Sequence, residues 1–216
     1  MIAEMKKSAD STKNTKEKIL DEALTLFAKN GFKGTSVKNI ADAVGIKDSS
    51  LYKHYKSKQE ILDTIVYNIK LRMENLAVRI GLPTEKDMRK VAEYYGELTL
   101  PMLVEIGRKT FLFYLEDEYI SRFWRLANME QYQNPEIYEI FHQIFMEESI
   151  EYQSALFKEM IRLNFFIDVD SDVIAMSFYT PIFFLLSKYN GREEKKDEAL
   201  QILEKQIAEF YRIYRK

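Results

Sequence analysis

Apolar residues recur three and four positions apart along most of this chain, and short polar or glycine-containing breaks separate the stripes. The first stripe runs from Ile19 to Phe27 and stops at Asn30-Gly31, which predicts an amphipathic helix over residues 15–30. Residues 1–14 alternate charged and small polar side chains without such a stripe, so we expect a flexible basic tail there. The spacing therefore indicates helical structure from residue 15 onward.

Three further helices are predicted before residue 81. The second starts after Thr35 or Ser36, because either hydroxyl can cap the free N–H groups of a helix. The third occupies about residues 47–55. The fourth covers residues 57–80 and opens with the capping box Ser57-Lys58-Gln59-Glu60. It is longer than a small domain needs, so we expect it to connect two domains.

Five more helical stretches follow the glycine and proline at the end of the connector. Asn134-Pro135-Glu136 is a good helix start, with proline at the first position. A polar break with a cap is expected between Asp168 and Asp172. The predicted stretches are 84–107 (kinked at Pro101), 108–132 (with a break near Glu116 left open), 135–163, 171–190 and 195–215.

The composition supports an all-α fold of about nine helices. Only 7 Gly and 4 Pro interrupt the 216 residues, too few for the many turns of an all-β protein. We predict an N-terminal three-helix helix-turn-helix head over residues 15–58 and the connector helix over 57–80. A larger helical-bundle domain for ligand binding and dimerisation would occupy residues 59–216.

Several kinds of chemistry are excluded by composition. The chain has no cysteine, so it has no disulfide, no thiolate nucleophile and no cysteine-based zinc site. We expect no metal and no other cofactor. The longest apolar runs, such as Phe183–Leu186, fall far short of a membrane span, and the N-terminus lacks the apolar segment of a signal peptide. We expect a cytoplasmic protein with no membrane partner.

The net charge of −2 is the sum of two regions of opposite charge. Residues 1–58 carry 12 Lys and 7 acidic side chains, a net charge of +5, whereas residues 59–216 carry a net charge of −7. A basic head on an acidic body is typical of a nucleic-acid-binding module attached to another domain. Surface lysines are common, so charge alone leaves this interpretation open.

Residues 37–55, VKNIADAVGIKDSSLYKHY, have the residue types that a helix-turn-helix needs. Two helices joined by a short turn approach closely only where the facing side chain is small, as at Ala41. Gly45, four residues later, suits the positive φ that such a turn requires. Apolar residues between Ile40 and Leu51 would fill the small core. A generic helical hairpin that ends in glycine is the alternative interpretation.

The third predicted helix presents side chains that suit a duplex. Short hydroxyls reach base edges in the major groove, whereas lysines and tyrosines suit phosphate oxygens. Lys58 and Thr35 lie at helix N-termini, which are natural phosphate positions. The predicted contacts to double-stranded DNA are Thr35, Ser36, Lys38, Lys47, Ser49, Ser50, Tyr52, Lys53, His54, Tyr55 and Lys58.

Residues 15–62, and above all GTSVKNIADAVGIKDSSLYKHYKSKQEIL from Gly34 to Leu62, resemble the DNA-binding head of the tetracycline-repressor (TetR) family. The run Leu51-Tyr52-x-x-Tyr55-x-x-Lys58, followed by Glu60 and Leu62, is its most specific part. The resemblance implies a homodimer with about nine helices per subunit, whose last two helices form a four-helix interface on the partner. Carried over by position, it implies DNA contacts at Thr35, Ser49, Ser50, Tyr52, His54, Tyr55 and Lys58. Beyond the head the likeness is limited to the number, length and order of the helices.

Lys47 and Asp48 depart from the family pattern, which often has Ser then Lys at the start of the third helix. A phosphate would repel the Asp48 carboxylate. Asp48 can instead cap the third helix or accept a hydrogen bond from a cytosine amino group. We favour the cap.

The middle of the chain is rich in aromatic residues, with 14 of them between Tyr94 and Phe157. Core packing is the simpler interpretation of each one, but together they exceed what a helical core requires. Apolar pockets with a few polar groups are the usual form of small-molecule sites, and the resemblance implies an effector site among the middle helices. We therefore expect a hydrophobic or aromatic effector. The candidate pocket residues are Tyr94, Met102, Phe111, Tyr114, Phe123, Trp124, Tyr132, Phe141 and Phe145.

The last two predicted helices are apolar over much of their circumference. An element of this kind either enters a core or meets a partner, and we favour a homodimer interface. The candidate interface residues are Ile174, Phe178, Pro181, Ile182, Leu185, Leu203, Ile207 and Phe210.

Three functions follow from these patterns. The favoured one is a repressor released from a palindromic operator by a small effector. The second is a DNA-binding dimer that answers to a protein partner or to no effector. The third, a helical-bundle enzyme, is disfavoured because Glu139 and His142 form only half of a carboxylate-bridged metal motif and no phosphate-binding glycine loop is present.

Overall fold

The computed structural model describes the backbone of residues 2–84 and 86–216, and the side chains of residues 15–84 and 86–216. Within these ranges all regular structure is helical, apart from one antiparallel β-bridge between Phe166 and Arg215. The predicted all-α class is confirmed. Across the same residues, no helix combines the length and the apolar character that a membrane crossing requires. The flexible tail expected over residues 1–14 lies outside the described side chains.

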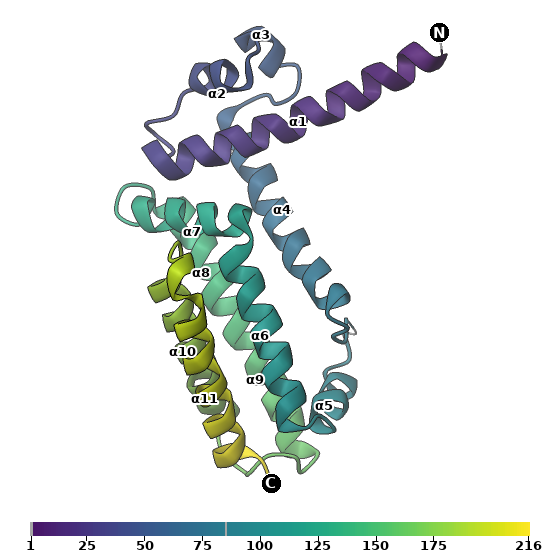
Figure 1. The fold of residues 1–216 in the computed structure, drawn as a ribbon, viewed down its shortest axis with the longest axis vertical. Helices are drawn as coiled ribbons and strands as arrows, with labels where there is room; N and C mark the ends of the chain where they lie inside the picture. The colour runs from purple at the N-terminus through teal and green to yellow at the C-terminus, as the bar shows by residue number, and fades with distance from the viewer. Residues whose placement is uncertain (1, 85) are drawn as a thin grey trace. The chain divides into compact units, whose positions relative to one another are not determined.

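Figure 1 shows the helices in chain order. They are α1 (Ile2–Asn30), α2 (Val37–Val44), α3 (Asp48–Leu51), α4 (Lys58–Arg79), α5 (Met88–Gly96), α6 (Leu100–Glu116), α7 (Glu118–Glu130), α8 (Pro135–His142), α9 (Glu148–Arg162), α10 (Ser171–Tyr189) and α11 (Lys196–Tyr214). A π-helical stretch, Gln143–Glu147, joins α8 to α9, and a 3-10 turn, Glu193–Lys195, precedes α11.

The chain divides into two compact units. The head unit comprises Met1–Leu71 and Arg122–Tyr138, and the body unit comprises Arg72–Ser121 and Glu139–Lys216. The predicted head over residues 15–58 lies within the head unit, which also includes residues 122–138 that the sequence pattern places in the body. Consequently α4, α7 and α8 each contribute residues to both units.

The head unit has its core on the first predicted stripe. Ile19 and Phe27 of α1 are fully buried, as are Ile40 of α2 and Leu51 of α3. The Phe27 ring packs on the Phe32 ring at 5.1 Å between centroids, which closes the turn after α1. Amphipathic spacing thus produces this core in the way that the sequence predicts.

Two predicted helices of the body have different boundaries in the structure. The stretch 84–107 is divided into α5 and α6, because α6 begins after Thr99 with Pro101 in its first turn, where the missing proline N–H is tolerated. Pro101 therefore starts a helix and does not kink one. The break left open near Glu116 is present, and it separates α6 from α7 at Asp117.

In the body unit, α9 packs against α5 and α10, while α11 packs against α6 and α10 (Figure 1). Phe157 of α9 stacks on Phe166 at 5.4 Å between ring centroids and lies 5.5 Å from the Phe210 ring of α11. These buried rings join the long helices at one end of the unit. Burial of large aromatic side chains is a major source of stability in a helical bundle.

Candidate nucleic-acid interface and ligand cavity

A glycine-dependent turn separates α2 from α3. Gly45 has a φ of +79°, its N–H donates to the Asp42 carbonyl at 3.1 Å, and the Ile46 N–H donates to the Ala41 carbonyl at 2.9 Å. These two bonds form a Schellman cap. A Cβ at Gly45 would meet no atom within 4 Å, so the backbone conformation is what requires glycine. Ala41 is fully buried. The predictions of a small, buried Ala41 and of a positive φ at Gly45 are therefore confirmed.

Ser36, rather than Thr35, caps α2. The Ser36 hydroxyl accepts from the Asn39 N–H at 3.1 Å, and the Asn39 side chain accepts from the Ser36 N–H at 2.9 Å. Thr35 is fully buried and its hydroxyl donates to the Gly31 carbonyl at 2.9 Å. The expectation that the Thr35 hydroxyl reaches a phosphate is corrected, because this hydroxyl closes the turn after α1.

The recognition segment consists of the short helix α3 and the turn that follows it. Ser49, Tyr52 and Lys53 are exposed, Tyr52 to 53%, while Ser50 and His54 are half-buried. Lys47 occupies the N-cap position without a side-chain cap bond, and Asp48 lies in the first turn. The expected Asp48 cap is therefore wrong, although a carboxylate there is favoured by the helix dipole.

Tyr55 and Lys58, both predicted to contact DNA, make contacts within the head. Tyr55 is only 5% exposed, and burial, followed by the nearby Glu60 carboxylate, raises its pKa. Lys58 donates to the carbonyls of Phe32 at 2.6 Å and Thr35 at 2.8 Å. Burial lowers the pKa of Lys58. Lys58 is half-buried and supplies donors to these backbone carbonyls, whereas Tyr55 is buried as part of the head core.

The remaining predicted contacts form the surface that we call the recognition surface. Its exposed members are Ser36, Lys38, Lys47, Ser49, Tyr52 and Lys53, with half-buried Ser50 and His54. Lys56, exposed between α3 and α4, was not predicted. The sequence could have indicated Lys56, because this lysine directly follows the third predicted helix. The surface combines cations for phosphates with hydroxyls for base edges.

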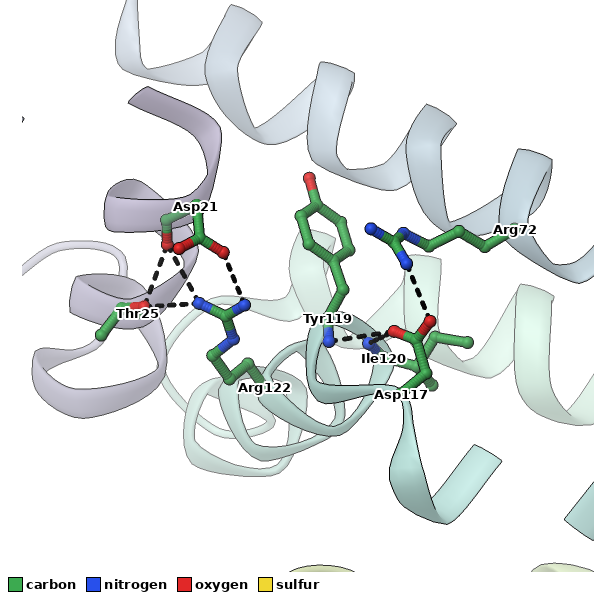
Figure 2. A network of polar contacts seen from close by, with 7 residues as sticks. All are labelled: Asp21, Thr25, Arg72, Asp117, Tyr119, Ile120 and Arg122. Atoms are coloured by element: carbon green, nitrogen blue, oxygen red, sulfur yellow. Dashed lines mark hydrogen bonds and ion pairs between the residues drawn. The ribbon is translucent and has the colours of Figure 1, made fainter. Parts of the chain in front are cut away.

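Helix α7 is tied to α1 inside the head unit, a link that the sequence did not predict. Figure 2 shows the Arg122 guanidinium reaching the Asp21 carboxylate at 2.6 Å and the Thr25 hydroxyl at 2.6 Å. Two turns further along α7, the buried Glu130 carboxylate accepts from the Phe32 N–H at 2.6 Å. Both links join segments about 100 residues apart, so no local pattern could reveal them.

The start of α7 is fixed within the body unit. Asp117 accepts from the N–H groups of Tyr119 and Ile120 at 3.0 and 3.1 Å, which caps the helix. The other oxygen of Asp117 accepts from Arg72 at 2.8 Å, as Figure 2 shows, and the Arg72 guanidinium also lies 4.7 Å from the Tyr119 ring centroid. The C-terminal half of α4 is thereby attached to the first turn of α7.

The body unit contains a cavity of about 420 Å³. It is lined by residues of α4, α5, α6, α9, α10 and α11 and of the π-helical stretch. Of the nine predicted pocket residues, Phe111, Tyr114 and Phe145 line it. Tyr94, Met102 and Tyr132 are exposed, Tyr132 to 89%, while Phe123 and Trp124 are buried in the head unit and Phe141 is buried away from the cavity. Those six predictions are wrong, because aromatic content does not reveal which face of a helix borders a void.

The cavity wall is mainly apolar, with several phenol groups. Burial raises the pKa of Tyr95 and Tyr114 far above the ordinary value, and it also raises that of Tyr152 and Tyr179. These hydroxyls therefore stay protonated at neutral pH. The Tyr179 hydroxyl donates to the Phe145 carbonyl at 2.5 Å. The charged residues among the lining are Glu148, which is exposed, and Arg215.

The exposed apolar face of α10 and α11 differs from the predicted dimer interface. Ile174, Leu185, Leu203, Ile207 and Phe210 are buried in the body unit, and Phe178, Pro181 and Ile182 are half-buried. The exposed residues are Val173, Met176 and Phe184 on α10, with Ile202 and Ile213 on α11. The hydrophobic pattern did not identify the exposed face because both helices are apolar around most of their circumference. Spacing alone could not separate the residues that face the core of the body unit from those that face outward.

Glu139 and His142 form half of a metal motif in the sequence, and no third metal ligand lies beside them in the described part of the chain. No three His, Cys, Asp or Glu side chains there come close enough together to hold an ion. A protein metal site usually needs at least three ligands.

A helix-turn-helix with exposed hydroxyl and cationic side chains, together with a ligand-sized cavity in the body unit, is a combination found in ligand-responsive DNA-binding proteins. Residues 19–65 match the family described as bacterial regulatory proteins, tetR family. This match covers the helix-turn-helix head and does not extend over the rest of the chain.

Curated relatives support this placement. The chain is 31% identical over 123 residues to the biofilm operon icaADBC negative transcriptional regulator IcaR of Staphylococcus aureus (strain Newman), which is 57% of this chain and 59% of that protein. The IcaR of Staphylococcus epidermidis is 31% identical over 122 residues, 56% of this chain and 58% of that protein. The chain thus matches about three fifths of the length of these relatives.

Solved structures share the fold along almost the whole chain. A putative TetR-family regulator from Mesorhizobium loti has a TM-score of 0.68 at 15% identity, covering 95% of this chain and 98% of the other. SmeT of Stenotrophomonas maltophilia in complex with triclosan has a TM-score of 0.67 at 18% identity, covering 94% and 92%. At these identities the likeness establishes the fold alone.

Proposed function

We propose that this protein is a DNA-binding transcriptional regulator that represses its target genes. The observation that carries the proposal is the Schellman turn at Gly45, which holds an exposed, hydroxyl- and lysine-bearing segment beside α2. The IcaR relatives, named as negative transcriptional regulators, support repression. The family and these relatives are regulators and not enzymes, which argues against a helical-bundle enzyme.

The test is selection of bound duplexes from a random pool, followed by fluorescence anisotropy at two salt concentrations. We expect a palindromic sequence whose half-sites lie about one helical turn apart or a multiple of it. We also expect affinity to fall steeply with salt, because lysine contacts release phosphate counterions. A purified protein that binds no duplex at low salt would refute the proposal.

A palindromic site requires two heads, so we propose a homodimer through the exposed face of α10 and α11. Phe184 is 60% exposed and, with Pro181 and Ile202, borders a shallow hollow on this face. Exposed apolar patches of this kind mark interaction sites. Phe184→Asp should therefore shift the protein from dimer to monomer in analytical ultracentrifugation, whereas Tyr132→Asp, at an exposed residue of the head unit, should not. Unchanged sedimentation of the Phe184 variant would place the interface elsewhere.

We further propose that a small molecule in the cavity releases the DNA. A ligand that binds one conformation better shifts the population toward it, and DNA must then weaken ligand binding by the same factor. The cavity favours this over a regulator without an effector. The complex of SmeT with triclosan, a protein of similar fold, supports the same choice. A compound that binds in the cavity without changing DNA affinity would contradict this role while leaving DNA binding intact.

A further inference from the structure

Arg215, at the C-terminal end of α11, is the one cationic residue in the wall of the cavity among the described residues. Its backbone is held by the β-bridge to Phe166, and the adjoining Ile167 N–H donates to the Tyr214 carbonyl at 3.0 Å. The position of this residue is therefore fixed by two segments that are far apart in the sequence.

The guanidinium of Arg215 is held as firmly as its backbone. It lies 5.2 Å from the ring centroid of Phe165 and 5.7 Å from that of Tyr211, at cation–π distance from both. Nη2 donates to the carbonyl of Gly96, the last residue of α5. Glycine is needed at that point because an added Cβ would collide with the Phe165 ring. Three elements thus converge to orient one side chain.

One end of this guanidinium has no partner within the described residues. Nη1 of Arg215 is buried and makes no hydrogen bond there. A buried N–H group without an acceptor costs about 1 to 3 kcal/mol, and more when it is charged. An arginine of the cavity wall with a buried donor that is unpaired among the described residues is suited to an anion, because a charge-assisted hydrogen bond would satisfy that donor.

The rest of the cavity fits the same kind of ligand. The phenols of Tyr95 and Tyr114 keep their protons, because burial raises their pKa, and so they can donate to an acceptor. The one carboxylate in the wall, Glu148, is exposed. The remaining wall is largely aliphatic and aromatic, and the volume equals that of about fourteen water molecules at roughly 30 Å³ each.

We propose that the cavity takes an organic anion, a carboxylate on an aliphatic or aromatic body, and that Arg215 holds its carboxylate group. This rests on the proposed function, since it names the chemical class of the effector. A charge pair is stronger inside a low-dielectric cavity than at the surface, and the pair of Arg215 with the carboxylate therefore supplies specificity. Burial of the apolar body of the ligand supplies most of the affinity.

The test uses three probes with the same alkyl chain, namely octanoate, octanol and octyltrimethylammonium, titrated into the full-length protein by calorimetry. We expect octanoate to bind at least about tenfold more tightly than octanol, which corresponds to about 1.4 kcal/mol. Arg215→Gln should remove this advantage and leave octanol binding unchanged, and Arg215→Lys should restore part of it. Arg212→Gln, which changes an exposed arginine one turn earlier, is the matched control.

The opposite results are equally clear. Equal binding of the three probes, no binding of octanoate, or tightest binding of octyltrimethylammonium with loss in Glu148→Gln would overturn the proposal. The comparison of octanoate with octanol in the unmodified protein decides the question even if the Arg215 variants fold poorly. DNA binding is measured separately without ligand, so a protein that binds octanoate but no duplex would refute the regulatory role and keep the ligand class.

Discussion

The helix-turn-helix of the head unit and the cavity of the body unit differ in how they arise from the sequence. The turn depends on two individual residues, Ala41 and Gly45, whose small size and backbone freedom are properties of the residue itself. The cavity depends on which faces of six helices are left without a filling side chain. A site that depends on local backbone conformation can therefore be predicted from a sequence, whereas a cavity between helices cannot.

The two units also use polar residues differently. In the head, Lys58 and Glu130 satisfy backbone groups around the turn after α1. In the body, the Tyr179 hydroxyl and one end of Arg215 do the same, but Nη1 of Arg215 is buried without a partner in the described part of the chain. Each unit thus keeps a buried polar atom without a hydrogen bond among the described residues, Glu130 Oε2 in the head and Arg215 Nη1 in the body, and of these two residues only Arg215 belongs to the cavity wall.

The largest expected effect is at the turn. Gly45→Val should cost about 2 to 3 kcal/mol of stability, because a β-branched residue is strained at positive φ. It should also lower specific DNA affinity on the order of a thousandfold, to the level of non-specific binding, since the recognition segment loses its position. Gly81→Val is the matched control, because Gly81 has a φ of +73° and equal space around it. Equal DNA affinity of both variants, measured by anisotropy, would contradict the role of the turn.

A second comparison tests which of the predicted pocket residues border the cavity. Phe145→Ala should lower the free energy of unfolding by about 3 kcal/mol, because Phe145 is buried beside the cavity and its removal enlarges the void. Tyr132→Ala should change it by less than about 0.5 kcal/mol, since Tyr132 is exposed. Urea denaturation of the two variants measures this difference, and similar losses would restore the original prediction for Tyr132.

A third prediction concerns the hydrogen bond that Glu130 of α7 accepts from the Phe32 N–H in the head. Glu130→Ala should destabilise the protein by about 2 kcal/mol, because the Phe32 N–H loses its acceptor. Glu130→Gln should lose less, since an amide oxygen can still accept this hydrogen bond. Thermal unfolding of both variants checks the order, with Glu136→Ala as an exposed control on α8. Equal losses in the two Glu130 variants would show that the charge near Lys58 matters more than the hydrogen bond.

The smallest expected effect is at a single phosphate contact. Lys53→Ala should weaken binding to all DNA sequences alike, by about tenfold or less, and lower the salt slope of log affinity by roughly 0.9. Ser50→Ala should instead change which sequence is preferred. Lys158→Ala, at an exposed lysine of α9, should change neither. A sequence-dependent loss in Lys53→Ala would assign this lysine to base reading.

By itself the sequence determined the all-helical fold, the first core stripe, the connector helix and the turn at Gly45. Each of these follows from periodicity or from the conformational range of one residue, which are local properties. Only the tertiary structure decided that Thr35 and Tyr55 are buried, that Lys58 binds the carbonyls after α1, that Arg122 of α7 binds α1, and that Arg215 borders the cavity. These outcomes depend on packing between segments up to about 120 residues apart, where a backbone carbonyl or a ring supplies the partner that no local pattern contains.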